Sequence, residues 1–326
     1  MRKTSPLFLA LILFVPGIPY AGVGRSAVAT LTQPNSARPA GLAEAYCAEA
    51  SGADSLGYNP SGLAWAVAPE LLVQYHGGFM GDTFLSVGYA QQAGNVGVGA
   101  SVVSYNSGSV DIIDDHGVGV TATGQRDIAY TAGVGGILPW PGLSAGAAIK
   151  LVQTQLVEQY SGSAIAGDAG IRLDIPGTGF SLGTSAQNLG GRIKIAEGTN
   201  SLPSTIRAGV AYRYDIEAEG TRVAGLEGIL EPEMRPEPAP HRVMFLCDGL
   251  YRLGDRIASL ALGGEYSFHG YFALRTGIRM PVYGTGNRNG AGTAGIGAKI
   301  RNVAVDYALE MTANAALHRV SVGFVF

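Results

Sequence analysis

From Glu70 to the C-terminus, the chain is a succession of segments of about ten residues in which apolar side chains alternate with small or polar ones. Alternate residues of a β-strand point to opposite faces, so this period of two predicts strands with one apolar face. The segment NVAVDYALE places on one face Val303, Val305, Tyr307 and Leu309, and on the other Ala304, Asp306, Ala308 and Glu310. The pattern predicts an all-β fold.

The second face of these strands differs from the surface of a soluble sheet. A water-exposed face carries many Lys, Glu, Thr and Ser, whereas this face is mostly Gly and Ala with isolated Arg, Asp and Glu. Charged residues make up 14% of the chain, against roughly 25% in soluble domains. Such a face is typical of a confined lumen, with the apolar face toward lipid. A soluble antiparallel barrel or sandwich also alternates and stays as the alternative.

Membrane insertion requires that the strands close into a barrel. After the N-terminal leader, no stretch approaches the ~18 consecutive apolar residues of a membrane helix, and open sheet edges are not tolerated in hydrocarbon. We predict a transmembrane antiparallel β-barrel over residues 70–326 with about fourteen strands. They are 70–80, 82–91, 95–106, 125–138, 143–154, 163–174, 179–188, 204–214, 241–251, 256–268, 270–281, 291–300, 302–310 and 317–326.

The lengths of the connections test this strand count. In outer-membrane barrels the periplasmic turns are short and the surface loops are longer. With both chain ends on the periplasmic side, tight connections such as PWPG (139–142) and PGTG (176–179) fall there, and the long 107–124 and 189–203 connections fall outside. Residues 216–240 break the rule, because this long segment falls on the periplasmic side. Either the count is wrong by one hairpin, or the barrel carries an unusual periplasmic loop.

The N-terminus has the features of a secretory signal peptide. Arg2 and Lys3 precede an apolar core at 6–15, which Pro16, Gly17 and Pro19 terminate. We predict a signal peptide over residues 1–21 with cleavage after Ala21, although Ala27-Val28-Ala29 fits the small-residue rule better at a greater distance. A retained anchor helix is the alternative, but the core is short for a membrane span.

Between the leader and the first strand, residues 22–69 follow neither the strand pattern nor a long helical one. The stretch YNPSGLAW, residues 58–65, combines Asn-Pro with Ser-Gly, which is turn chemistry. Asn59 can cap or turn the backbone, while Pro60 fixes φ and removes one donor. An ordinary solvent-exposed turn is the plainer interpretation.

The whole chain after the leader resembles the PorV/PorQ family, which is related to the long-chain fatty-acid (FadL-type) transporters. The resemblance begins in the segment SARPAGLAEAYCAEASGADSLGYNPSGLAW. The resemblance continues in LGTSAQNLGGRIK, GGEYSFHGYFALRTGIR and the closing strands. Glu44-Ala45 departs from it, since the family favours glycines there, as does Ser61 in place of alanine. The matching residues are Ala37-Arg38, Gly41-Leu42, Ala53-Asp54 and Asn59-Pro60-Ser61-Gly62-Leu63-Ala64.

The resemblance implies that residues 22–69 form a hatch, or plug, folded inside the barrel, with the motif Asn59, Pro60, Ser61 and Gly62 in it. It also implies that aromatic Phe324 and Phe326 at the C-terminus form the signal that barrel-assembly machinery recognises. Irregular backbone at membrane depth is tolerated where protein or water surrounds it, which suits a plug.

Alternation places a set of polar wall residues in the lumen. One role is to pair with each other and hold the hatch, and a second is to line a path for a polar or amphipathic solute. The residues are Lys150, Asp168, Arg172, Arg207, Arg213, Glu265, Arg275, Arg279, Lys299, Asp306, Glu310 and Arg319.

The sequence lacks the residues that several classes of protein function require. A net charge of −3 gives no basic field for nucleic acid. No Cys or His cluster has zinc spacing, no Gly-Lys-Ser/Thr follows the glycine-rich stretches, and the five histidines are scattered with no Gly-x-Ser-x-Gly partner. We expect no enzyme, metal or cofactor. Cys47 and Cys247 are too few for a disulfide scaffold.

Two functions stay open for this predicted monomer of the outer membrane. One is transport of hydrophobic or amphipathic small molecules across that membrane through the hatch-gated barrel. The other, suggested by the resemblance, is a docking or shuttle role for exported proteins in type IX-like secretion. The expected partners are outer-membrane lipid, barrel-assembly machinery, and either such a ligand or an exported protein.

Overall fold

The computed structural model of the chain describes residues 26–78, 81–113, 119–195, 198–216, 241–284, 290–313 and 315–326. The signal peptide predicted over 1–21 lies outside the described residues, as does most of the 216–240 segment. Among the described residues, no helix is long and apolar enough to cross a membrane.

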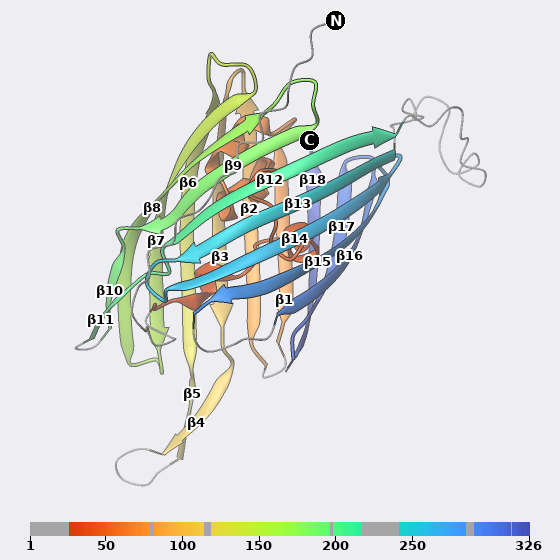
Figure 1. The fold of residues 1–326 in the computed structure, drawn as a ribbon. Helices are drawn as coiled ribbons and strands as arrows, with labels where there is room; N and C mark the ends of the chain where they lie inside the picture. The colour runs from red at the N-terminus through yellow and green to blue at the C-terminus, as the bar shows by residue number, and fades with distance from the viewer. Residues whose placement is uncertain are drawn as a thin grey trace, which may run out of the picture.

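Fourteen antiparallel strands close into one barrel (Figure 1), which confirms the predicted fold and strand count. β1 completes the ring by pairing with β2 on one side and with β18 on the other. The barrel strands are β1 (Glu70–Gly77), β2 (Thr83–Ala93), β3 (Val96–Asn106), β6 (Gln125–Ile137), β7 (Leu143–Leu156), β8 (Tyr160–Asp174), β9 (Phe180–Leu189), β12 (Thr205–Ile216), β13 (His241–Arg252), β14 (Ile257–Phe268), β15 (Phe272–Tyr283), β16 (Ala291–Ile300), β17 (Val303–Met311) and β18 (Ala316–Val325).

The exterior of the barrel is apolar. On β8 and β15, Ile165 and Leu274 expose 64% and 61% of their surface, and on β18 the outward Val320 and Phe324 alternate with the buried Arg319 and Ser321. Large aliphatic and aromatic side chains on the outside of a closed barrel require lipid rather than water around it. The chain is therefore an outer-membrane barrel, and the soluble alternative is wrong.

The two ends of the barrel differ in their connections. At the end that holds Glu70 and Phe326, β2 is joined to β3, and β14 to β15, by tight turns. We assign this end to the periplasm, because short turns lie there in such barrels. β12 ends and β13 begins at the same end, at Ile216 and His241. The strand count has therefore not slipped by a hairpin, because Ile216 and His241 both lie at the periplasmic end. Residues 217–240 lie outside the described part of the chain.

At the opposite end, two of the long connections contain hairpins that lie outside the barrel sheet (Figure 1). They are β4–β5 (Ser109–Ile113 and Gly119–Thr123) and β10–β11 (Arg192–Ile195 and Gly198–Ser201). Both regions were predicted from the sequence to be surface connections without strands. Strands of four or five residues are too short for a period of two to separate them from irregular loop.

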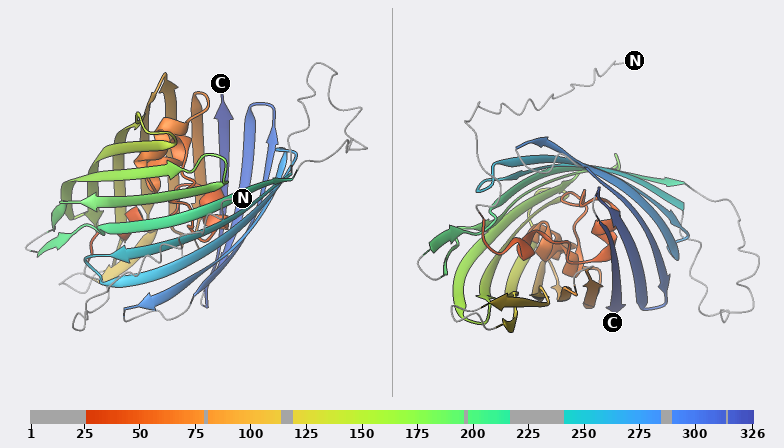
Figure 2. Two further views of the ribbon diagram at one scale, coloured as in Figure 1. Left: turned by 45° about the horizontal axis from the view of Figure 1, so that its top comes forward. Right: turned by 90° about the horizontal axis from the view of Figure 1, so that it is seen from below.

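Residues 26–69 lie inside the barrel as a series of short helical turns (Figure 2). They are η1 (Ala29–Thr32), α1 (Ala37–Gly41), η2 (Gly52–Gly57) and η3 (Pro60–Trp65). The segment begins at the extracellular end, where Ser26 bridges Ser201 of β11, and reaches the periplasmic end at Glu70. It therefore runs the length of the lumen. We call residues 26–69 the hatch.

Apolar packing holds the hatch at several places along its path. Near the extracellular end, Val28 packs against Val152 of the wall and Ile193 of the β10–β11 hairpin. Further along, Tyr46 and Tyr58 meet edge to face, with ring centroids 5.4 Å apart, in a cluster that includes Met244. Leu56 and Leu63 pack near β1 and β2 in a third cluster, with Leu72, Ala90, Ala53, Ala66 and Ala148.

Candidate functional site

The Asn-Pro-Ser-Gly motif begins the last helical turn of the hatch. Asn59 is the N-cap of η3, where its side-chain oxygen accepts hydrogen bonds from the Ser61 amide (3.2 Å) and hydroxyl (2.7 Å). Pro60 occupies the first turn, where the amide hydrogen that it lacks would have no helical partner. The Asn59 amide group donates to the carbonyls of Cys47 (3.0 Å) and Ile171 (3.1 Å). One buried side chain thus joins two parts of the hatch to β8.

Glycines of the wall allow the motif to approach the strands closely. A Cβ added at Gly170 of β8 would collide with the Asn59 side chain, and one at Gly146 of β7 would collide with the Pro60 carbonyl. At Gly62 a Cβ would collide with the Ala50 carbonyl. Glycines at these lumenal positions therefore leave the space that the hatch occupies.

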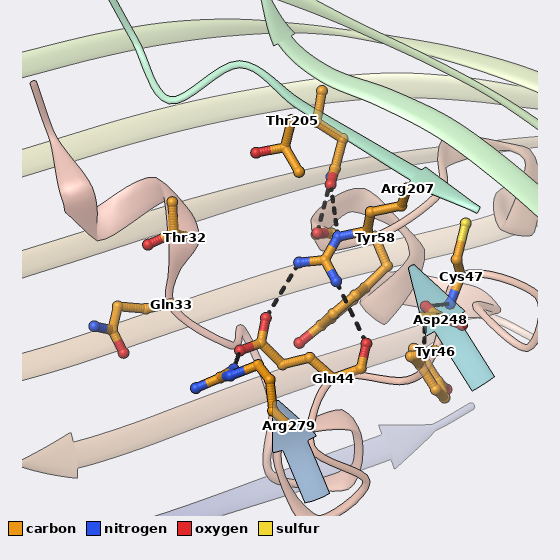
Figure 3. A network of polar contacts seen from close by, with 12 residues as sticks. Thr32, Gln33, Glu44, Tyr46, Cys47, Tyr58, Thr205, Arg207, Asp248 and Arg279 are labelled. Carbon is orange, nitrogen blue, oxygen red and sulfur yellow. Dashed lines mark hydrogen bonds and ion pairs between the residues drawn. The ribbon is translucent and has the colours of Figure 1, made fainter. Parts of the chain in front are cut away.

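Glu44 is the centre of the polar contacts between hatch and wall (Figure 3). Its buried carboxylate pairs with Arg207 of β12 at 3.1 Å and with Arg279 of β15. Arg279 pairs in turn with Glu310 (2.6 Å), and Glu310 with Arg319 (2.6 Å). Arg319 donates back to the hatch at Gln33 (3.1 Å). A continuous chain of polar contacts thus runs from β12 through Glu44 of the hatch to β15, β17 and β18, and returns to the hatch at Gln33.

Two further hatch charges bind other strands. Glu49 pairs with Arg213 of β12 (2.7 Å) and lies 3.8 Å from Arg172 of β8. Arg38 forms a two-pronged pair with Glu265 of β14, with both donor–acceptor distances at 3.0 Å. Bidentate arginine–carboxylate pairs fix orientation as well as distance. The hatch is therefore bound to both sides of the ring of strands.

Asp248 of β13 binds the hatch backbone. One of its carboxylate oxygens accepts from the amides of Tyr46 (2.9 Å) and Cys47 (2.8 Å) (Figure 3). The Cys47 thiol lies 3.7 Å from the Ser185 hydroxyl of β9. This turn of the hatch is thus held by a charge-assisted pair of hydrogen bonds, which are stronger than neutral ones.

The structure places the predicted lumenal residues on β7, β8, β12 and β14–β18, and all but one form ion pairs. The exception is Lys299, which is exposed at the end of β16 and makes no ion pair with a described residue. Pairs to the hatch were described above for Arg172, Arg207, Arg213, Glu265 and Arg279. Pairs within the wall include Lys150–Asp168 (2.8 Å), Arg172–Asp174 (3.0 Å), Arg275–Glu265 (2.6 Å), Arg275–Asp306 (2.5 Å), Arg279–Glu310 and Glu310–Arg319.

Burial shifts the titration of groups in the hatch. It raises the pKa values of Tyr46 and Tyr58, and it raises the pKa of the Cys47 thiol to about 12 with a contribution from the nearby Asp248. The pKa of Asp54 rises to about 7 because the carboxyl is buried and lies near Glu70. The thiol of Cys47 is therefore protonated and shielded while the hatch is in place, and Asp54 titrates near neutral pH.

A cavity of about 420 Å³ lies between the hatch and the wall at the periplasmic end. Its lining comes from α1 and η2 of the hatch and from the periplasmic ends of β1 and β13–β18. Within the described residues there is no group of three or more His, Cys, Asp or Glu able to hold a metal ion. Its volume is within the range of small-molecule pockets, roughly 300–1,000 Å³.

The hatch side of this network was not predicted from the sequence. Arg38, Glu44 and Glu49 bind the wall, and Asp248 binds the hatch, yet none of them was among the predicted site residues. A signal was present, because Glu44 and Glu49 are isolated charges in an Ala-rich segment that was expected to be buried. Buried charges require partners, and the wall arginines supply them.

The C-terminal aromatics lie at the periplasmic end of β18, away from the lumen. Phe324 and Phe326 are both exposed on the outside, and the Phe326 amide donates to the Pro69 carbonyl at 2.9 Å. Their recognition by barrel-assembly machinery stays a prediction.

Comparison with solved structures agrees with this fold. The barrel superimposes on the Pseudomonas putida toluene transporter TodX with a TM-score of 0.52 and 12% sequence identity, covering 88% of this chain and 98% of TodX. A Pseudomonas aeruginosa FadL homologue gives a TM-score of 0.51 at 10% identity, covering 89% of this chain and 98% of the homologue. No protein-family profile matches the sequence, and no curated protein matches it either. The chain has a FadL-like outer-membrane barrel fold.

Proposed function

We propose that this chain is an outer-membrane channel for hydrophobic or amphipathic small molecules, gated by its hatch. The observation that carries the proposal is that the hatch fills the lumen yet is bound to the wall by side-chain contacts, centred on Glu44, Glu49 and Asp248. Such contacts can be exchanged without unfolding a barrel strand. The proposal assigns no catalytic role to any residue.

Two features support small-molecule transport. The fold is that of a protein described as a toluene transporter, which suggests hydrophobic solutes for this chain also. The lumen carries many charged pairs, and the cavity beside the hatch has polar as well as apolar lining. We therefore favour amphipathic molecules over purely apolar ones, and the polar wall residues serve both to hold the hatch and to line the path.

Uptake into cells tests this function. Bacteria that lack their own hydrophobic-molecule channels would express the protein, and the initial uptake of labelled palmitate and toluene would be measured. We expect faster uptake than in cells without the protein, with a further increase for Glu44→Gln, which loosens the hatch. Uptake equal to that of cells without the protein, when the barrel is folded in the outer membrane, would contradict the proposal.

A second candidate is docking of exported proteins, as in the PorV/PorQ family. The observation that favours it is the pair of hairpins at the extracellular end, where Ile113 of β4 is 79% exposed and Val110 is also exposed. Apolar side chains exposed on a projecting hairpin are available for contact with another protein.

Photo-crosslinking from position 113, followed by mass spectrometry of gently purified protein, distinguishes the two candidates. A crosslinked secreted protein or secretion subunit would favour docking. Stoichiometric lipid or aromatic small molecules without a crosslinked protein would favour transport. For either function we propose a monomer, with Phe324 and Phe326 as its assembly signal.

A further inference from the structure

The periplasmic cavity contains a group of charges that balance each other. Glu265 pairs with Arg38 (3.0 Å) and Arg275 (2.6 Å), and Arg275 also pairs with Asp306 (2.5 Å). Two guanidinium groups therefore offset two carboxylates. The other charged pairs at the rim are closed by residues outside the cavity, Glu49 by Arg213 and Arg242 by Asp215.

Two carboxylates in the same cavity are not balanced. Asp54 of η2 and Glu70 of β1 both line it, and neither makes an ion pair with a described residue. Lys299 is the remaining cation of the lining, and its exposed ammonium group can offset one of the two charges. The cavity therefore holds a net negative charge at its hatch side.

Asp54 is the buried end of this pair. It is 8% exposed, and its Oδ1 has no hydrogen-bond partner among the described residues, although the cavity is beside it. A buried carboxylate oxygen without a partner costs free energy. Burial and then the nearby Glu70 raise the pKa of this carboxyl group, whereas the Ser36 side chain, within hydrogen-bonding range of it, and Arg38 lower it. A cation in the cavity would supply the missing charge.

The apolar part of the lining indicates which kind of cation would fit the cavity. The buried Leu72 and Met244, with Tyr271, give the cavity an apolar side, and its volume is about 420 Å³. A bare metal ion would leave that surface unused, and an ammonium group can donate three hydrogen bonds. We propose that this cavity binds a small amphipathic molecule through a primary ammonium group held by Asp54 and Glu70, with the apolar part against Leu72 and Met244. The inference concerns binding alone and does not depend on transport.

Calorimetry on the full-length protein, purified in detergent, tests the proposal. At pH 8 and below micelle-forming concentrations, the probes are n-octylamine, octanol and octanoate, which share a chain and differ in charge. We expect octylamine to bind at least tenfold more tightly than octanol, because hydrogen bonds to charged groups are stronger than neutral ones. Asp54→Asn should remove this preference. The matched control Asp111→Asn, on the exposed β4–β5 hairpin, should keep it.

Two further variants keep the test decisive. If Asp54→Asn does not give a heat-modifiable, folded barrel, Glu70→Gln should reduce the octylamine preference in its place. A short-chain phosphatidylethanolamine that binds more tightly than octylamine, with the gain lost in Lys299→Gln, would support the ammonium site with a lipid headgroup as its source. The proposal is overturned if octylamine binds no better than octanol, if Asp54→Asn and Glu70→Gln keep the preference, or if octanoate binds best.

Discussion

Glu44→Gln is expected to release the hatch without unfolding the barrel. The substitution keeps the shape of the side chain and removes the charge that lies between Arg207 and Arg279. Breaking a buried ion pair costs roughly 3–5 kcal/mol, because the remaining charge is left without compensation. Arg279 keeps Glu310 at 2.6 Å, whereas Arg207 keeps only neutral acceptors such as the Gln187 oxygen at 3.3 Å. We therefore expect Glu44→Gln to destabilise the seated hatch by about 3 kcal/mol, the lower figure.

Cys47 reports the opening of the hatch. Its thiol is fully buried and its pKa is raised to about 12 by that burial, so a maleimide reagent reacts with it when the hatch leaves its seat. Replacing the exposed Cys247 by Ser leaves Cys47 as the single thiol. If the hatch recloses faster than it is labelled, the labelling rate follows the open population. About 3 kcal/mol then corresponds to a rate increase on the order of 100-fold.

The matched control is Asp215→Asn, which breaks the exposed Arg242–Asp215 pair at the periplasmic rim. An exposed pair contributes about 0–1 kcal/mol, and this one does not touch the hatch, so Cys47 labelling should stay at the wild-type rate. If Glu44→Gln labels no faster than the control, the Glu44 ion pairs do not hold the hatch and the reasoning is refuted.

Three other substitutions test the seat of the hatch, each followed by thermal unfolding of the hatch through Trp65 fluorescence in a Trp140→Phe background. Gly170→Ala should destabilise the seated hatch by about 1–3 kcal/mol through overpacking against Asn59. The control Gly249→Ala should leave the midpoint unchanged, because a Cβ at that position meets only the Ala208 carbonyl oxygen, at 3.9 Å. Asn59→Ala removes a helix cap and two buried hydrogen bonds and should cost about 1–3 kcal/mol; an unchanged midpoint would show that the cap contributes nothing. Because the pKa of Asp54 rises from ~3.9 when unfolded to about 7 in the seated hatch, the hatch should become more stable as pH falls from about 7 toward 5 and less stable above 7. Asp54→Asn should flatten this dependence, and a wild-type midpoint that does not change between pH 5 and 8 would contradict it.

The barrel was predictable because its signal repeats in every strand. On β18, for example, Val320 and Phe324 face outward while Arg319 and Ser321 face inward, and the sequence alone specifies this alternation. Since each barrel strand needs about ten such residues, an error at one border does not change the count. The β4–β5 and β10–β11 hairpins were missed because their strands are only four or five residues long.

The contacts of the hatch were less predictable. Asn59 and Pro60 are recognisable as a turn or cap from local chemistry, and the structure places them there. The partner of Glu44, by contrast, is Arg207, which lies 163 positions away. Such a pairing depends on where the hatch sits in the closed barrel, and no local pattern encodes that position. The close contacts of the hatch with Gly146 and Gly170 could not be predicted for the same reason, because glycines are expected on the lumenal face of any barrel with a crowded interior.

A reversible lock on the hatch tests the central claim most directly. Cys47 lies 3.7 Å from the Ser185 hydroxyl, so Ser185→Cys in a Cys247→Ser background should form a disulfide that fixes the hatch to β9. Uptake of labelled palmitate by cells carrying this variant would be measured with the bond oxidised, confirmed by intact mass, and again after reduction. The hatch-gated channel predicts that uptake stops in the oxidised state and returns on reduction. Equal uptake in both states would show that solutes do not need the hatch to move.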